Sequence, residues 1–197
     1  TLVPRALWWF RWGAMFTFLS GLMMLLLHAH QNNFSLIRSY ELYIYTGALL
    51  GTLMFLNVWV IIWPAQKIVI ASSESVASGG EADPNAAAAL GKAGLASRTN
   101  TLFSIPMLFF MGAARGLNFL SNDINCTLYA VIAVTVVILI LELNAIKGKM
   151  GFMGSVKGVI HCGLGLTVLL YLLLTFLVCH KEKNDDKESA SITLNAY

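Results

Sequence analysis

The chain has 197 residues, of which 57% are hydrophobic and only 12% are charged. This balance excludes an ordinary soluble domain, in which about a quarter of the residues are charged. The net charge of +3 is small, and nothing in the composition indicates a nucleic-acid partner.

Apolar runs close to the ~20 residues that cross a bilayer recur along the chain. They lie at about residues 7–28, 42–63, 101–118, 126–146 and 156–179. Backbone amides inside lipid must be bonded within their own segment, so each run is predicted to be a helix. The predicted fold is an all-α integral membrane protein, with one bundle of about five helices over residues 1–180 and a polar outer tail over residues 181–197.

The basic side chains predict how this bundle is oriented. If the first helix starts in the cytoplasm, eight lysines and arginines fall on the cytoplasmic side and five on the other. Three of those five lie in the tail among acidic residues. Cytoplasmic loops of membrane proteins carry the excess of basic residues, so the N-terminus is expected inside and the C-terminus outside.

The first predicted helix opens with tryptophans and ends with histidines. Trp8, Trp9 and Trp12 are typical of the aromatic belt at the headgroup level. His28 and His30 at the far end of the helix are interpreted as solvated interfacial residues.

The second predicted helix contains Gly47 and Gly51, a small-xxx-small pattern that lets helices approach closely in lipid. The simplest explanation of Asn57, deeper in the membrane than the polar residues after it, is an interhelical hydrogen bond. Pro64 is predicted to end this helix, because the residue before a proline avoids the helical conformation. Residues 68–97 are then expected to form an inner-side loop, with a short helix over residues 84–96.

The last two predicted helices add a buried acid and a second glycine series. Glu142 lies near the inner end of its helix and needs a partner, because carboxylates are rare inside lipid. Gly154 and Gly158 could bring another helix close, either within the bundle or from another protein. The tail is expected to be disordered, or ordered only by a partner.

Polar side chains near the inner ends of the helices are predicted to converge. The candidate binding residues are Arg11, Asn57, Gln66, Lys67, Arg98, Asn100, Glu142 and His161. A planar anion such as a purine would find a guanidinium, amides and tryptophan faces there. The same residues could instead form a buried structural network, for instance with an ion pair between Arg11 and Glu142.

No cofactor and no metal ion are predicted. The sequence contains no Cys-x-x-Cys-His, no dinucleotide fingerprint, no phosphate-binding glycine loop and no His-x-x-x-His. A non-covalent haem needs two ligands that face each other at one depth. His161 is expected on the inner side and His28, His30 and His180 on the outer side, so only a His28–His180 pair meets this requirement, and no haem is predicted from it. Cys126 and Cys179 fall at the same outer level, where oxidation is allowed, and are interpreted as small packing residues rather than a disulfide. Cys162 is expected on the reducing side and inert.

Three segments resemble a known family: residues 6–13 (ALWWFRWG), 57–67 (NVWVIIWPAQK) and 98–112 (RTNTLFSIPMLFFMG). The family is the urate oxidase N-terminal family, the membrane domain of the cytochrome-c-linked urate oxidases. The resemblance covers roughly the first 115 residues and fades over the last two helices. It implies a bacterial inner membrane, further helices upstream, and a cytochrome c on the outer side, where this sequence has its polar tail.

Two functions are consistent with these features. The first is a non-catalytic integral-membrane subunit of a larger complex of the redox or respiratory type, which contacts lipid and other membrane subunits. The second is a membrane oxidoreductase of the urate oxidase type that passes electrons to a separate cytochrome c. The missing cofactor motifs and the tail in place of an electron acceptor favour the first.

Overall fold

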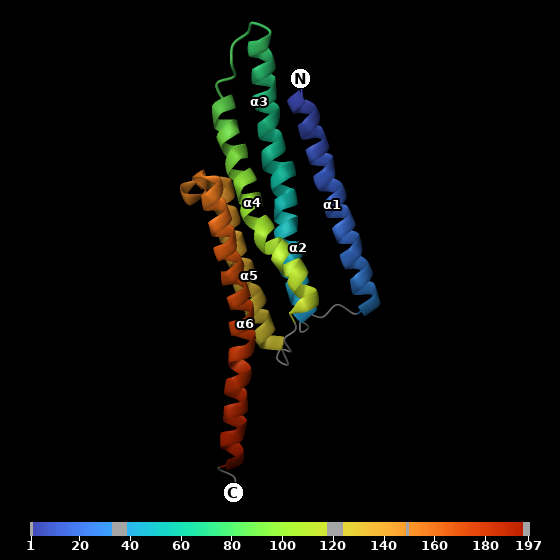
Figure 1. Cartoon of the computed structure of the whole chain (residues 1–197), viewed down its shortest axis with the longest axis vertical. Coiled ribbons are helices and arrows are strands. Elements are labelled where there is room, and N and C mark those ends of the chain that lie inside the picture. The colour runs from blue at the N-terminus through green and yellow to red at the C-terminus, as the bar shows by residue number, and fades with distance from the viewer. Residues whose placement is uncertain (1, 33–38, 118–123, 149, 195–197) are drawn as a thin grey trace.

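The computed structural model describes residues 2–32, 39–117, 124–148 and 150–194, and within these ranges the regular structure is helical. The elements are α1 (Leu2–Asn32), α2 (Ser39–Leu56), η1 (Asn57–Ile62), α3 (Trp63–Ala77), α4 (Ala86–Gly116), α5 (Ile124–Lys147), η2 (Gly151–Gly154) and α6 (Val156–Leu194). The helices α2 and α3 are joined through η1 into one continuous rod. The rods stand side by side and alternate in direction, as Figure 1 shows.

Within the described ranges, four helical stretches are long and apolar enough to cross a membrane: Arg5–Gln31, Tyr40–Ala77, Asn125–Lys147 and Val156–Leu177. The chain is therefore a multi-pass membrane protein, and the predicted all-α class is confirmed. The predicted run at 101–118 falls in the second half of α4, which is not one of these four. This half of α4 packs inside the bundle, where Phe103 and Phe110 are completely buried.

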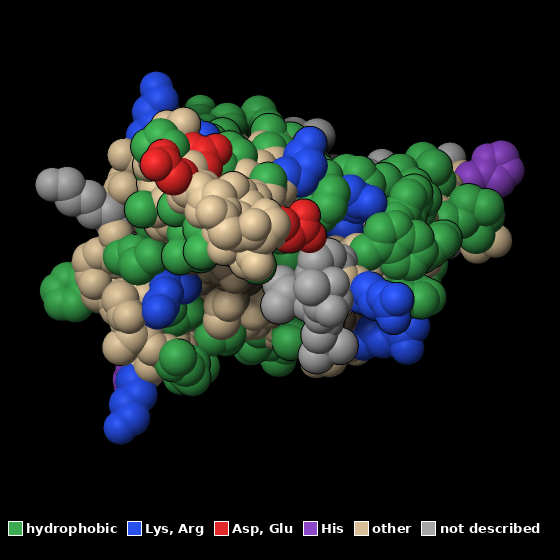
Figure 2. Space-filling view, turned by 90° about the horizontal axis from the view of Figure 1, so that it is seen from above, with side chains coloured by type: hydrophobic (Ala, Val, Ile, Leu, Met, Phe, Trp, Pro, Cys, Tyr) green, Lys and Arg blue, Asp and Glu red, His purple; other side chains and the backbone are tan. Residues whose placement is uncertain are grey.

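The turns and termini sort to the two ends of the bundle. The N-terminal end of α1, the α3–α4 turn and the α5–α6 turn lie at one end, and the C-terminal end of α6 lies at the other (Figure 1). The helix α1 stands at the edge, and none of its residues from 5 to 31 is fully buried. Figure 2 looks onto the end with the α3–α4 turn, where lysine and arginine side chains surround the rim and acidic ones are fewer.

Small residues set the closest helix contacts. A Cβ added at Gly47 would lie 3.4 Å from the Met111 side chain, and one at Gly51 would lie 3.5 Å from the sulfur of Met107. The first glycine series therefore serves contact between α2 and α4 inside the bundle. In the second series a Cβ at Gly158 would collide with the carbonyl oxygen of Phe152. Gly158 therefore makes room for the backbone of the neighbouring η2, and not for another helix.

The prediction that Pro64 ends the second helix is wrong. The helix continues to Ala77, and the turn just before the proline widens into the π-helix η1. There the Trp63 N–H donates to the carbonyl of Val58, five residues back. A proline lacks an N–H and collides with the carbonyl four residues back in an α-helix, and the wider turn displaces that carbonyl.

The predicted long loop is also wrong, because α3 reaches Ala77 and α4 starts at Ala86. The expected short helix at 84–96 and the third predicted membrane helix are one helix, α4. The Asp83 carboxylate accepts the N–H of Asn85 in the connecting turn. Alanines on α3 and α4 form a separate small core: Ala65, Ala89 and Ala93. Side chains this small let the two helices pair closely beyond the main core.

The polar tail is not disordered over its described length. The helix α6 continues to Leu194 and extends past the end of the bundle, as Figure 1 shows. Its sequence there mixes lysines with acidic residues. An isolated polar helix of this length is marginal in water, but here the membrane helix before it supplies the nucleus.

Candidate functional site

Three of the predicted binding residues meet at one point, which we call the Asn57 tie: Asn57, Asn100 and Glu142. The Asn57 side-chain nitrogen donates to Asn100 Oδ1 at 2.9 Å and to Glu142 Oε2 at 3.1 Å. The Asn100 nitrogen in turn donates to the carbonyl of Met54 at 3.0 Å. Asn57 is 1% exposed and Glu142 is 8% exposed. The tie therefore links the α2–α3 rod, α4 and α5 inside the bundle, as the interhelical bond predicted for Asn57 requires.

The predicted ion pair between Arg11 and Glu142 is wrong. The Arg11 guanidinium carbon lies 3.9 Å from the ring centroid of Trp63, 5.3 Å from that of Trp59 and 5.8 Å from that of Trp12. We call these three rings the tryptophan cage. Aromatic faces attract a guanidinium, and this attraction offsets part of the free-energy cost of desolvating it. Arg11 of α1 therefore contacts the rings instead of Glu142.

Lys67 joins Arg11 at this cage and not at the Asn57 tie. Its Nζ lies 6.0 Å from the ring centroid of Trp63, so one indole is near two cations. Between described residues, the contact of a basic with an acidic side chain within 4 Å is that of His28 with Glu41, at 3.4 Å. Neither Arg11 nor Lys67 is neutralised by a described acidic side chain.

The remaining predicted residues lie apart from both groups. Arg98 donates from Nη1 to the carbonyl of Met153 at 2.6 Å and fastens α4 to η2. His161 is exposed, and its Nδ1 donates to the carbonyl of Lys157 one turn earlier in α6. Gln66 is half-buried on α3. The eight residues therefore do not form the single cluster that was predicted.

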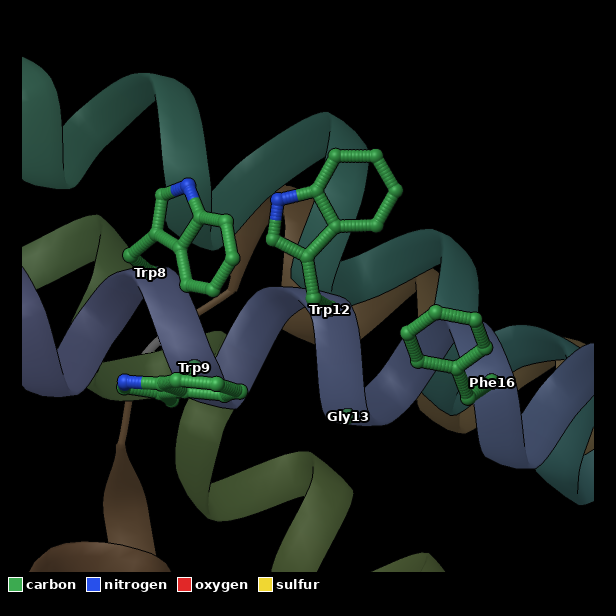
Figure 3. Close-up of a pocket in the computed structure, with 5 residues that line it drawn as sticks. All are labelled: Trp8, Trp9, Trp12, Gly13 and Phe16. Atoms are coloured by element: carbon green, nitrogen blue, oxygen red, sulfur yellow. The ribbon is translucent and has the colours of Figure 1, made fainter.

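A cavity of about 480 Å³ lies against α1, lined by Trp8, Trp9, Trp12, Gly13 and Phe16. Figure 3 shows Trp8 and Trp12 on the side of α1 that faces the α2–α3 rod, and Trp9 on another side. Phe16 follows Trp12 by one helical turn, with the two ring centroids 6.4 Å apart. No atom lies within 4 Å of a Cβ built on Gly13, so this glycine leaves the wall of the cavity open. We call this surface the α1 groove; the belt of tryptophans was its only signal in the sequence.

Several buried polar atoms at these places have no hydrogen-bond partner among the described residues. Asn57 Oδ1 is one, at the Asn57 tie. Arg11 Nε, Trp12 Nε1 and Trp59 Nε1 are three others, all at the tryptophan cage. The cage therefore offers N–H donors and positive charge, whereas the tie offers a single carbonyl oxygen.

Sequence reasoning missed a polar contact at the opposite end of α1. His28 Nε2 lies 3.4 Å from Oε1 of Glu41, which is 1% exposed, and the His28 ring packs on Tyr40 at 4.8 Å. His28 is thus partly inside the bundle rather than simply solvated, while His30 is exposed. The spacing in sequence gave no signal, because the contact crosses the connection between α1 and α2.

The comparison with known families matches the chain to one family model, described as urate oxidase N-terminal, over residues 34–163. Two of the three resembling segments, 57–67 and 98–112, lie within the match, and residues 6–13 lie before it. The match also continues through α5 into α6, further than the resemblance predicted. A search of curated proteins found no match, and a search of solved structures found none either. Because the model covers well over half of the sequence, this chain belongs to the urate oxidase N-terminal family.

Proposed function

We propose that the chain is a non-catalytic integral-membrane subunit of a larger complex of the redox or respiratory type, built on a urate-oxidase-like membrane domain. The Asn57 tie is the observation that carries this proposal. Asn57, Asn100 and Glu142 bond to one another across three helical rods instead of facing one open cavity. Arg98 likewise bonds to a backbone carbonyl of the α5–α6 connection. Such bonds hold a bundle together and fix its shape for assembly.

The proposed setting is the bacterial inner membrane, with the N-terminus in the cytoplasm and the C-terminus in the periplasm. The basic rim in Figure 2 supports this orientation, because cytoplasmic ends carry the excess of lysine and arginine. The proposed partners are membrane lipid, other integral-membrane subunits and a cytochrome c on the periplasmic side. The polar extension of α6 is the proposed docking element, since it is helical and projects beyond the bundle.

Deleting residues 183–197 tests this docking element. We expect the shortened chain to remain inserted and folded, because the described core lies before residue 178. When the tagged chain is purified in mild detergent, the amount of partner protein that co-purifies with it should fall at least several-fold. Phe152→Ala is a matched control, because Phe152 is 90% exposed but lies at the opposite end of α6. Partner recovery that is unaffected by the deletion would reject the docking element.

A second candidate function is a membrane oxidoreductase of the urate oxidase type that passes electrons to a separate cytochrome c. Family membership favours it. Asn57 Oδ1, which has no partner among the described residues, is also an acceptor of the kind that a purine N–H needs. The purified chain, urate and an oxidised cytochrome c should then give reduced cytochrome c, seen in its absorption spectrum. Asn57→Ala or Arg98→Ala should abolish that rate, while Asn144→Ala on α5 should leave it unchanged. Urate-dependent reduction by the wild-type chain would overturn the subunit proposal.

A further inference from the structure

The tryptophan cage and the α1 groove lie next to each other at one end of the bundle, and the Asn57 tie uses neither. Trp12 belongs to both, because it lines the groove and lies 6.0 Å from Trp59 in an edge-on contact. The two together form a surface that is cationic on one side and apolar on the other. We infer that this surface binds an anionic phospholipid, with the phosphate at Arg11 and Lys67 and an acyl chain in the α1 groove.

The charge at the cage is the first support for a phosphate. Arg11 and Lys67 approach the same indole, that of Trp63, at 3.9 Å and 6.0 Å. No described acidic side chain pairs with either cation. Both cations therefore lie near one ring, and a phosphate bound at the cage is attracted by two positive charges. Arginine also matches the oxygens of a phosphate with its planar fork of donors.

The orphaned donors are the second support. Arg11 Nε, Trp12 Nε1 and Trp59 Nε1 are buried and have no partner among the described residues. An indole or guanidinium N–H can only donate, and a buried one normally has an acceptor. A phosphate carries several acceptor oxygens, so one group can satisfy donors that come from both α1 and η1.

The apolar α1 groove favours a lipid over a small soluble anion as the ligand. Its lining is a run of aromatic rings interrupted by Gly13, and Figure 3 shows these side chains along a single helix face and its neighbour. A free phosphate gains nothing from about 480 Å³ of apolar space, because it binds through polar contacts, whereas a hydrocarbon chain can fill that space. Aromatic belts also mark the headgroup level of a bilayer, which is where a lipid phosphate lies.

The composition of the chain provides a direct probe of this surface. Its five tryptophans are Trp8, Trp9, Trp12, Trp59 and Trp63, and all of them belong to the cage or the groove. Intrinsic fluorescence therefore reports on this one surface. Bromine atoms on an acyl chain quench indoles that they touch, so brominated lipids will show whether a chain occupies the groove.

The experiment titrates the purified full-length chain in detergent with brominated phosphatidylglycerol or with brominated phosphatidylcholine of the same chain length. We expect phosphatidylglycerol to quench at a concentration about tenfold lower, the difference that one charge-assisted hydrogen bond gives. Arg11→Gln and Lys67→Gln should each remove most of this preference, and Arg115→Gln at the other end of α4 should keep it. Lys67 is exposed, so Lys67→Gln remains informative even where Arg11→Gln fails to fold.

Competition distinguishes the lipid from other anions. Inorganic phosphate or urate at millimolar concentration should leave quenching by phosphatidylglycerol unchanged within twofold. Relief of quenching by inorganic phosphate would instead show a small-anion site, and relief by urate would assign the cage to a purine. Equal quenching by the two lipids would show an unselective apolar surface. Each of these three results would overturn the proposal.

Discussion

At the scale of single residues, Asn57 has more consequences than its size suggests. One amide nitrogen serves acceptors on two other helices, so the Asn57 tie depends on a single side chain. A membrane hydrogen bond contributes only about 1 kcal/mol by itself. Removing Asn57 costs more, because Glu142 then loses its described partner in a site that is 8% exposed.

A double-mutant cycle tests which partner Glu142 has. We expect Asn57→Ala and Glu142→Ala to be coupled by about 1 kcal/mol in the free energy of unfolding, because they share a hydrogen bond. Arg11→Ala and Glu142→Ala should add within about 0.5 kcal/mol, because Arg11 contacts the tryptophan cage instead. Unfolding by sodium dodecyl sulfate, followed by circular dichroism, measures both cycles. Coupling of Glu142 to Arg11 alone would show that the observed arrangement is wrong.

At the scale of elements, the contact between α4 and α6 depends on a glycine that the sequence did not single out. A Cβ at Gly163 would lie 2.5 Å from Cδ1 of Ile105. Gly165, two residues further along the same helix, has no atom within 4 Å of the equivalent position. The two glycines are alike in sequence, and only the rotation of α6 against α4 distinguishes them.

This contrast predicts opposite outcomes for the same substitution. We expect Gly163→Val to destabilise the bundle by about 2 kcal/mol, because the added methyl groups force Ile105 and α4 aside. The side chain added by Gly165→Val points away from the bundle, so this variant should lose much less stability than Gly163→Val. Both variants replace a glycine by a β-branched residue in the same helix. Adding Ile105→Ala should restore part of the loss at position 163. Thermal unfolding in detergent measures all three variants, and equal losses at 163 and 165 would contradict the packing.

The helices themselves were predictable, but their ends were not. Apolar runs of bilayer length follow directly from the sequence, because lipid leaves the backbone little choice. Pro64 misled the prediction, since a proline ends most helices and the π-turn that absorbs it leaves no signal in hydropathy. The pairing of α3 with α4 was missed because alanines carry little apolar area, although Ala65, Ala89 and Ala93 pack well together.

The candidate site was predicted in part for a related reason. Depth along each helix could be estimated from the sequence, so polar residues at one level were grouped together. Depth does not give the direction in which a side chain points. Asn57, Asn100 and Glu142 face one another, whereas Arg11 and Lys67 face the tryptophans and His161 is exposed. Rotation of each helix about its own axis depends on packing across the whole bundle.

At the scale of the whole molecule, the α3–α4 turn and the C-terminal end of α6 lie at opposite ends (Figure 1). We expect a membrane-impermeant thiol reagent outside intact cells to label Ser189→Cys and not Ser78→Cys, because the basic end should be cytoplasmic. Both variants need a background without the native cysteines at 126, 162 and 179. Permeabilised cells should label both variants, and the reverse pattern in intact cells would invert the proposed orientation.

The length of the second rod has a consequence for anything that approaches the basic end. Tyr40–Ala77 spans 38 residues, which is about 57 Å of helix at 1.5 Å per residue. A bilayer is only about 40–45 Å thick with its headgroups, so a rod of this length that stands upright extends past the headgroups into water. Figure 1 shows the α3–α4 turn rising beyond the α5–α6 turn, and the alanine contacts keep that projection narrow. A partner on this side therefore contacts a narrow two-helix projection before it reaches the membrane, and it has to bind beside this projection.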